Sequence, residues 1–393
     1  MFGNAFAGKR VFVTGHTGFK GSWLCLWLQR LGADVTGYAL PPVTQPNLFE
    51  AAGVASHVRH IEADVRDAAR LQAAIAEAAP DFVFHLAAQP LVLESYAAPA
   101  ETFAINVDGS INLMEAIRKT RTRAAVVMVT TDKVYLNREW EHGYREEDPL
   151  GGHDPYSASK AAMEIAVASW RNSFFEPARV AEHGVHMASA RAGNVIGGGD
   201  WSANRLVPDL ARSRAGNTPP ELRNPGSLRP WQHALEPLGG YLLLAARLAG
   251  RSGEQYAGAW NFGPLPTDVR NVGELAGALL DHWGRAGWKD ISDVDAPHEA
   301  GLLRLSIDKA VSRLGWRPVW DFAGTVARTA DWYAAVMSEK VSAREACEAD
   351  LAAYCAAATF AADELRTDQN VRATEAIMRA PACDRPNVRA ASA

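Results

Sequence analysis

Short apolar runs alternate with longer amphipathic stretches through the first 190 residues of the chain. Each run is rich in β-branched or aromatic side chains and stops at a glycine or a polar cluster, which is typical of strands buried on both faces. Strands that alternate with helices predict an α/β fold with a doubly wound parallel sheet. The predicted strands lie at 10–14, 34–40, 124–130 and 186–191, with others starting at residues 61 and 81.

The composition is that of an ordinary globular protein, with 48% hydrophobic and 22% charged residues. The net charge of −5 and the lack of a long basic run argue against nucleic acid as the main partner. The four cysteines show no Cys-x-x-Cys spacing, so we expect no disulfide framework, no metal site and a reducing cytoplasm. No apolar run approaches the length of about 18 residues that a membrane span needs, and we expect no membrane partner.

A glycine turn separates the strand at 10–14 from a helical stretch that begins at Ser22. Gly15, Gly18 and Gly21 are spaced three apart, and glycines in such a turn let a backbone approach a pyrophosphate at a helix N-terminus. Thr17 and Phe19 belong to the same turn. The pattern predicts dinucleotide binding, and the alternative is a tight turn that binds nothing.

The second strand, 34–40, gives no preference between NAD and NADP. An acidic residue near its end would hold the ribose of NAD, but two prolines follow Leu40, and no arginine stands there for an NADP phosphate. Asp64, followed by Val65, is either an adenine contact or the cap of the helix at 68–79.

The strand that starts at residue 81 runs into a turn of small residues, Leu86, Ala87 and Ala88, where a cofactor can lie close to the backbone. His85 lies within the apolar part of this strand, so we interpret it as a core histidine rather than a catalyst. A helix at 101–119 follows and contains Asn106.

Tyr156 and Lys160 are four residues apart at the start of a helical stretch, so their side chains share one face. An ammonium beside a phenol favours the phenolate, which suits proton transfer. The alternative is a surface helix with a solvated lysine. Thr130, Thr131 and Asp132 come at the end of the strand at 124–130, where open α/β sheets bind ligands.

Two loops of the second half carry polar and aromatic side chains. Residues 192–201 are glycine-rich and end at Trp201, and Arg229 and Trp231 lie in the second cluster. A loop arginine suits phosphate recognition, and either tryptophan suits stacking on a base or sugar. An ion pair and hydrophobic packing are the equally weighted alternatives.

Taken together, these residues resemble the extended short-chain dehydrogenase/reductase family over most of the chain. The resemblance implies a Rossmann-type fold, NAD as cofactor and a homodimer or higher homo-oligomer formed through the helices at 101–119 and 155–174. Its markers are Gly15, Gly18, Gly21, Asp64, Val65, Leu86, Ala87, Ala88, Asn106, Thr130, Thr131, Asp132, Tyr156, Lys160 and the loop from Arg191 to Trp201.

Within this family the chain looks most like the sugar-nucleotide 4,6-dehydratases that act on CDP-glucose. The resemblance implies that Tyr156 takes a proton from the sugar 4-hydroxyl, that Lys160 holds the nicotinamide ribose, and that Thr131 binds the 4-oxygen. It also implies that Asp132 protonates the departing 6-hydroxyl, which requires a raised pKa. Relatives acting on other sugar nucleotides carry glutamate at the position of Lys133, which leaves the base for the C5 proton open.

The resemblance further implies that Asn194 and Arg229 bind the pyrophosphate and His298 the nucleotide. We therefore expect a dinucleotide-binding domain (1–190), a mixed α/β substrate lobe interleaved with it (191–340), and a C-terminal helical extension and tail (341–393). A 4-epimerase of the same family is the nearest rival, although it does not need the acid Asp132. A dinucleotide sensor on the same fold is a more distant rival.

Overall fold

The computed structural model describes residues 2–214, 219–285, 287–292 and 302–359. Seven parallel strands form the main sheet in the order β11-β6-β5-β4-β1-β2-β3, which confirms the predicted doubly wound fold. The strands are β1 (Arg10–Thr14), β2 (Asp34–Ala39), β3 (Arg59–Glu62), β4 (Phe82–His85), β5 (Ala125–Val129), β6 (His186–Ala192) and β11 (Ala259–Phe262).

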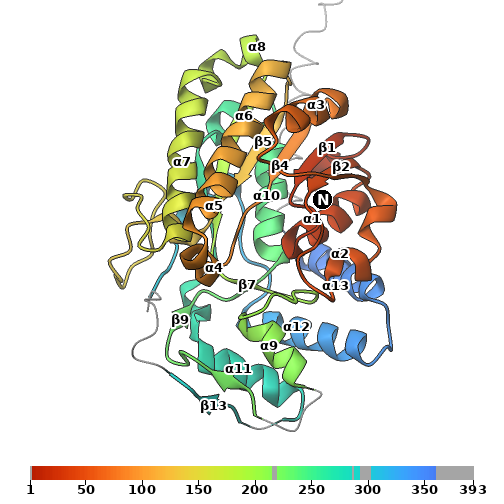
Figure 1. Ribbon diagram of the computed structural model, residues 1–393, viewed down its shortest axis with the longest axis vertical. Coiled ribbons are helices and arrows are strands. Elements are labelled where there is room, and N and C mark those ends of the chain that lie inside the picture. The colour runs from red at the N-terminus through yellow and green to blue at the C-terminus, as the bar shows by residue number, and fades with distance from the viewer. Residues whose placement is uncertain (1, 215–218, 286, 293–301, 360–393) are drawn as a thin grey trace, which may run out of the picture.

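Helices cover both faces of this sheet (Figure 1). On β1, Val11 and Val13 enter the core beneath α1 and α10, whereas Phe12 enters the core beneath α3, α6 and α7. This alternation follows from the two-residue period of a strand and explains why the strands are apolar throughout. These helices are α1 (Phe19–Arg30), α10 (Leu235–Leu248), α3 (Ala68–Ala78), α6 (Gly109–Thr120) and α7 (Pro155–Ser173).

Helix starts follow the local sequence. Asp67 caps α3 by accepting a hydrogen bond from the Arg70 backbone, so of the two alternatives for Asp64 the helix cap is wrong. The predicted helix at 101–119 is α5 (Pro99–Phe103), a π segment η3 (Ala104–Asp108) that contains Asn106, and then α6. The other short turns are η1 (Phe2–Asn4), η2 (Val54–His57), η4 (Asp132–Val134), η5 (Pro177–Arg179), η6 (Gly253–Tyr256), η7 (Pro266–Asp268) and η8 (Ala310–Leu314).

A smaller lobe lies below the main sheet in the view of Figure 1 and contains α9, α11 and α12. Its strands pair two by two, as β10 with β7, β12 with β9 and β13 with β8. The remaining elements are α2 (Leu48–Ala51), α4 (Val92–Ala97), α8 (Val180–His183), α9 (Leu206–Ser213), α11 (Val272–His282), α12 (Phe322–Met337), α13 (Ala343–Ala357), β7 (Val195–Ile196), β8 (Glu221–Leu222), β9 (Leu228–Arg229), β10 (Gln232–His233), β12 (Arg270–Asn271) and β13 (Lys289–Asp290).

The C-terminal helix α13 connects the two parts of the molecule. It packs against α1 through the edge-to-face pair of Trp27 and Tyr354 and also packs against α12. The Tyr354 hydroxyl donates to the buried carboxylate of Glu236 on α10 at 2.9 Å. The C-terminal extension expected at 341–393 begins with α13, and residues 360–393 lie outside the described part.

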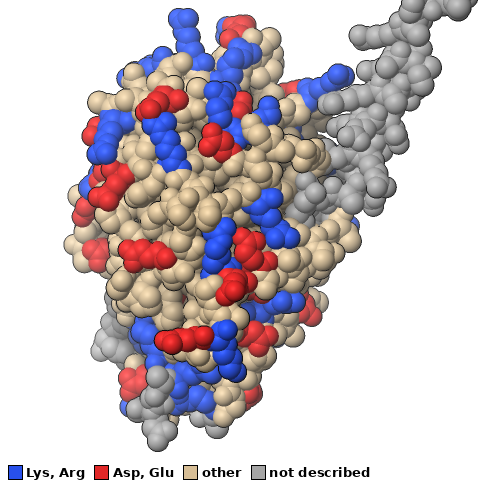
Figure 2. All heavy atoms as spheres, turned by 90° about the vertical axis from the view of Figure 1, so that its right-hand side faces the viewer, with Lys and Arg blue, Asp and Glu red and all other residues tan. Residues whose placement is uncertain are grey.

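Charged side chains of both signs are intermixed on the face seen in Figure 2, in keeping with the small net charge. Among the described helices, none is long and apolar enough to cross a membrane. The described cysteines, Cys25, Cys347 and Cys355, are all unpaired. No group of three or more potential metal ligands occurs among the described residues.

Candidate active site

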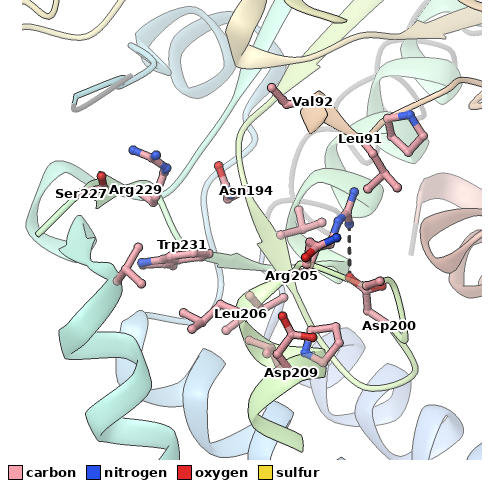
Figure 3. A pocket seen from close by; sticks show the side chains of 18 of the residues that line it. Leu91, Val92, Asn194, Asp200, Arg205, Leu206, Asp209, Ser227, Arg229 and Trp231 are labelled. Carbon is pink, nitrogen blue, oxygen red and sulfur yellow. Dashed lines mark hydrogen bonds and ion pairs between the residues drawn. The ribbon is translucent and has the colours of Figure 1, made fainter. Parts of the chain in front are cut away.

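A cavity of about 1100 Å³ opens where the main sheet meets the smaller lobe. The carboxyl ends of β5 and β6 form one wall, and α9 and the segment around β8 and β9 form the other (Figure 3). This is the edge at which parallel sheets bind ligands. Seven of the predicted site residues line it: Thr130, Thr131, Asp132, Lys133, Tyr156, Asn194 and Arg229.

Tyr156 and Lys160 lie in the first turns of α7, as predicted. Asp154 caps this helix by accepting from the Ser157 backbone at 3.0 Å, and Pro155 occupies its first position. The Lys160 ammonium is buried and donates to the Val129 carbonyl at 3.3 Å. The cap therefore fixes where α7 begins and presents the tyrosine to the cavity.

The charge states of this pair depend on burial. Burial lowers the pKa of Lys160 to about 7; the nearby Lys20 adds to this shift and Glu164 opposes it. Burial also raises the pKa of Tyr156 to about 12, while hydrogen bonding with Thr131 opposes that shift. Without ligands, burial thus outweighs the stabilisation of the phenolate expected from the neighbouring lysine.

Asp132 is buried at the floor of the cavity, with only 2% of its surface exposed. One carboxylate oxygen accepts from the Thr131 hydroxyl at 3.0 Å. Gly193 leaves room for the other, because a Cβ there would lie 2.9 Å from Asp132 Oδ2. Burial raises the pKa of this carboxyl, against the opposing effects of Lys133 and Thr131. The site therefore favours the protonated carboxyl that a general acid needs.

At the glycine turn, the backbones that follow β1 and β4 and the first turn of α1 lie so close together that no side chain fits between them. A Cβ at Gly15 would lie 2.6 Å from the Ala87 backbone nitrogen, and one at Gly21 would lie 2.1 Å from the Gly15 carbonyl oxygen. Gly15 also has a φ of +72°, which favours glycine. Gly18 precedes α1 with no side-chain cap, so the first amides of the helix are available to an anion. This turn fits a dinucleotide.

The residues around the turn are placed as follows. Thr17 donates to the Leu40 carbonyl at 2.8 Å and so ties the turn to the end of β2. The ring of Phe19 lies beside Gly197 of the glycine-rich loop at 192–201. Leu86, Ala87 and Ala88 follow β4, so Ala87 lies directly against Gly15.

The end of β2 carries no acid, and a pair of histidines lies beside it. His16 Nε2 and His60 Nδ1 are 2.7 Å apart, and burial lowers the pKa of His16 to about 3. Asp64 accepts hydrogen bonds from both the backbone and the guanidinium of Arg66, while its own backbone carbonyl accepts from Tyr38. Val65 is buried under Gly109. No local pattern around His16 or His60 indicates this pair, because the two residues are 44 positions apart.

Asn106 connects the turn after β4 with α7. Its side-chain oxygen accepts from the Gln89 backbone at 2.9 Å, and its amide donates to Ser159 at 2.8 Å. His85 is buried between the hydroxyls of Thr14 and Ser110, at 2.7 and 2.9 Å. The prediction that His85 is a core histidine is therefore confirmed.

Three arginines, Arg205, Arg223 and Arg229, line the wall of the cavity opposite the main sheet. Arg229 lies beside Ser227, with Asn194 on the neighbouring segment, whereas Arg205 pairs with Asp200 at 3.2 Å (Figure 3). Arg229 is a predicted site residue, whereas Arg205, which follows the glycine-rich loop, and Lys20, which lines the same cavity, were not predicted. Burial lowers the pKa of Lys20 to about 8.

The two tryptophans differ in role. Trp201 packs edge-on against Tyr333, so hydrophobic packing is the correct alternative for this residue. Trp231 lines the cavity, and its indole nitrogen donates to the Arg270 carbonyl at 3.1 Å. His298 lies outside the described residues.

The family model of the NAD dependent epimerase/dehydratase family matches residues 11–258. The chain is 49% identical over 333 residues to the CDP-glucose 4,6-dehydratase of Salmonella typhimurium, covering 84% of this chain and 92% of that protein. Among solved structures, it resembles the dTDP-glucose 4,6-dehydratase DesIV of Streptomyces venezuelae with NAD and TYD bound (26% identity, TM-score 0.69, 84% and 98% of the two chains). It also shares the fold of the dTDP-glucose 4,6-dehydratase of Bacillus anthracis in complex with NAD (18% identity, TM-score 0.68, 82% and 96%).

Proposed function

Because the chain belongs to the NAD dependent epimerase/dehydratase family, we propose that it dehydrates CDP-glucose to CDP-4-keto-6-deoxy-glucose. The observation that carries this proposal is the 49% identity to the Salmonella enzyme over most of both chains. The cavity supplies the matching chemistry, since a phenol, an acid and a lysine meet at the carboxyl edge of the sheet. The protein is thus a lyase that uses a nicotinamide cofactor.

The cofactor of this proposal is NAD, held by the glycine turn and the N-terminus of α1. When bound, NAD supplies a hydride acceptor that also returns the hydride, so no external reductant is consumed. Asn106 and Lys160 support its nicotinamide end, and Thr130 follows directly after β5 beside it. Asp64 and Val65 support its adenine end.

Each catalytic side chain then has one task. Tyr156 takes the proton of the sugar 4-hydroxyl while the C4 hydride leaves, and Thr131 binds the resulting 4-keto oxygen. The ketone acidifies the C5 proton, for which Lys133 on the cavity wall is the candidate base. Asp132 gives its proton to the 6-hydroxyl, which departs as water. Return of the hydride to C6 and of a proton to C5 completes the 6-deoxy sugar.

The substrate phosphates belong on the opposite wall. Arg229 offers a planar fork for one phosphate, and Asn194 offers an amide from the adjacent loop. Arg205 supplies a second positive charge to the same cavity. His298 retains its predicted role in nucleotide binding.

A second copy of the chain is the proposed partner. Helices α4, α5 and α7 pack together, and several large apolar side chains on them or at their ends are more than a third exposed, which an interface between two copies would cover. These side chains are Leu93, Tyr96, Phe103, Ile165 and Phe174, with exposed fractions between 38% and 62%. A homodimer through these helices buries them.

The chain organisation and location complete the proposal. Residues 1–190 bind the dinucleotide and 191–340 bind the substrate. The latter segment is interleaved with the first because β11 and α10 return to the main sheet. Residues 341–393 form a C-terminal extension. The three described cysteines are unpaired, which supports a reducing cytoplasm as the site of action.

The test is mass spectrometry of the protein with catalytic NAD in heavy water, offered CDP-, UDP-, dTDP- and GDP-glucose in separate reactions. Loss of water from CDP-glucose, with one solvent deuteron retained at C5, is the expected result. Loss of water from another nucleotide sugar and not from CDP-glucose would overturn CDP-glucose as the substrate. An isomer of unchanged mass with inverted C4 would favour a 4-epimerase and overturn dehydration.

A further inference from the structure

The loop between β7 and α9 presents an arginine to the cavity. Arg205 occupies the N-cap position of α9 and lines the cavity, with 35% of its side chain exposed. Its Nη1 donates to Asp200 Oδ2 at 3.2 Å (Figure 3). Its side chain makes no other hydrogen bond or ion pair with the residues that the structure describes. A guanidinium has five N–H donors, so most of this one remains available to a ligand.

The acidic partner of this pair is buried. Asp200 is only 3% exposed, although it also lines the cavity. Its Oδ1 accepts from the Ser202 backbone at 3.0 Å, and its Oδ2 is the oxygen that accepts from Arg205. The two oxygens therefore have different tasks, since Oδ1 closes a turn of the loop whereas Oδ2 holds the guanidinium.

The loop is also held by contacts that do not involve this carboxylate. Tyr333 of α12 donates to the backbone carbonyl of Asp200. Arg212 of α9 donates to the backbone carbonyls of the next two residues of the loop, at 3.0 and 3.3 Å. The backbone of the loop therefore has its own supports, and the pair between Asp200 and Arg205 determines the direction in which the guanidinium points.

We propose that Asp200 is a positioning residue, which aims the Arg205 guanidinium at the diphosphate of the substrate. The inference rests on the proposed function, because the ligand that it assigns is the diphosphate of a nucleotide sugar. A planar guanidinium can bind phosphate oxygens through two parallel hydrogen bonds, and one that is already fixed loses less conformational entropy on binding. A carboxylate that acted only through its charge would repel the diphosphate, so the two roles predict opposite effects of its removal.

The first readout is the steady-state kinetics of water loss from CDP-glucose by Asp200→Asn. The amide oxygen can still accept from the Ser202 backbone, but the amide nitrogen then faces the guanidinium, and two donors cannot pair. We expect KM to rise about tenfold while kcat stays within about twofold of wild type, because the lost contact serves the ground state and the transition state equally. An unchanged or lower KM would overturn the inference.

Asp81→Asn is the matched control. Asp81 likewise accepts from a backbone N–H, that of Arg10 at 3.0 Å, and pairs with the guanidinium of the same residue at 3.3 Å. It directly precedes β4 and so lies at the amino edge of the sheet, whereas the cavity lies at the carboxyl edge. The KM of this variant should equal that of wild type. An equal rise of KM in both variants would show a general loss of stability and would contradict positioning by Asp200.

The second readout is a double-mutant cycle in binding, which needs no turnover. Calorimetry measures the affinity of the intact chain for CDP in Asp200→Asn, in Arg205→Met and in the double variant. If Asp200 acts through Arg205, all three lose the same factor, about tenfold, whereas losses that multiply in the double variant would show a separate structural role and overturn the inference. Cytidine, which has no phosphate, should bind every variant as it binds wild type.

NAD also carries a diphosphate, so its affinity is measured in the same variants. Loss of NAD binding with unchanged CDP binding would assign Arg205 to the cofactor and overturn the inference. If Asp200→Asn does not fold, Asp200→Ser replaces it in the cycle, because a serine hydroxyl can also accept from the Ser202 backbone. A wild-type protein that binds CDP but removes no water from CDP-glucose would refute the proposed function alone, and one that does not bind CDP would overturn both.

Discussion

Replacing Asp132 by asparagine tests the acid that distinguishes dehydration from epimerisation. The amide has the shape of the carboxyl and fits beside Gly193, where the missing Cβ leaves the space. In the wild-type protein the Thr131 hydroxyl donates to Asp132 Oδ1 at 3.0 Å, and the side-chain oxygen of asparagine can accept the same hydrogen bond. The amide, however, has no acidic proton to transfer. General acid catalysis contributes about 10²- to 10⁴-fold, so we expect kcat for water loss to fall by that factor, about 3–5 kcal/mol of activation free energy.

The assay is the rate of water loss from CDP-glucose by mass spectrometry, at saturating substrate and over a pH series. Because burial raises the pKa of Asp132 and its protonated form is required, wild-type activity is full below that pKa and declines as pH rises through it. The variant should lack this decline and should melt at or above the wild-type temperature. Asp209→Asn, the same change at an exposed cavity residue, is the control. A variant that keeps more than about a tenth of kcat would refute the assignment of Asp132 as the acid.

Three further changes test the substrate wall, the packing and the dimer. Arg229→Lys should raise KM for CDP-glucose about tenfold or more with less effect on kcat, measured by steady-state kinetics; an unchanged KM would contradict phosphate binding there. Gly198→Ala places a Cβ 1.9 Å from the ring of Trp332 and should cost about 1–3 kcal/mol in denaturant unfolding, whereas Gly226→Ala meets nothing within 4 Å and should cost little. Ile165→Glu should shift sedimentation from dimer to monomer without lowering helix content, and an unchanged dimer would move the interface elsewhere.

Local patterns sufficed for the elements that carry the reacting groups. The strand predicted at 10–14 is β1, residue for residue, because its apolar run is bounded by Arg10 and Gly15. The face shared by Tyr156 and Lys160 also follows from sequence alone. Residues four apart on a helix lie on the same face, and the capping residue Asp154 marks where this helix begins. In both cases the information lies within a few residues.

Other features depend on residues far apart in the chain. Strand β11 pairs with β6 about seventy residues earlier, and no local signal in its four residues indicates that partner. The glycine-rich loop serves both purposes, because its residues 193–197 line the cavity. Its central Gly198 lies under Trp332, and the Gly198 carbonyl accepts from the Trp23 indole at 2.9 Å. Small residues permit a ligand or a large side chain to approach equally well, so composition does not distinguish the two.

The charge states of the site are the feature that the sequence conveyed least. A lysine four residues from a tyrosine predicts a stabilised phenolate, but this holds only if the lysine is an ammonium. In the fold, Lys160 is buried and faces Lys20, which belongs to the glycine turn 140 residues earlier. Its protonation therefore depends first on burial and then on the nearby charges of Lys20 and Glu164. The motif places the catalytic groups, whereas the tertiary structure decides which of them carries the proton.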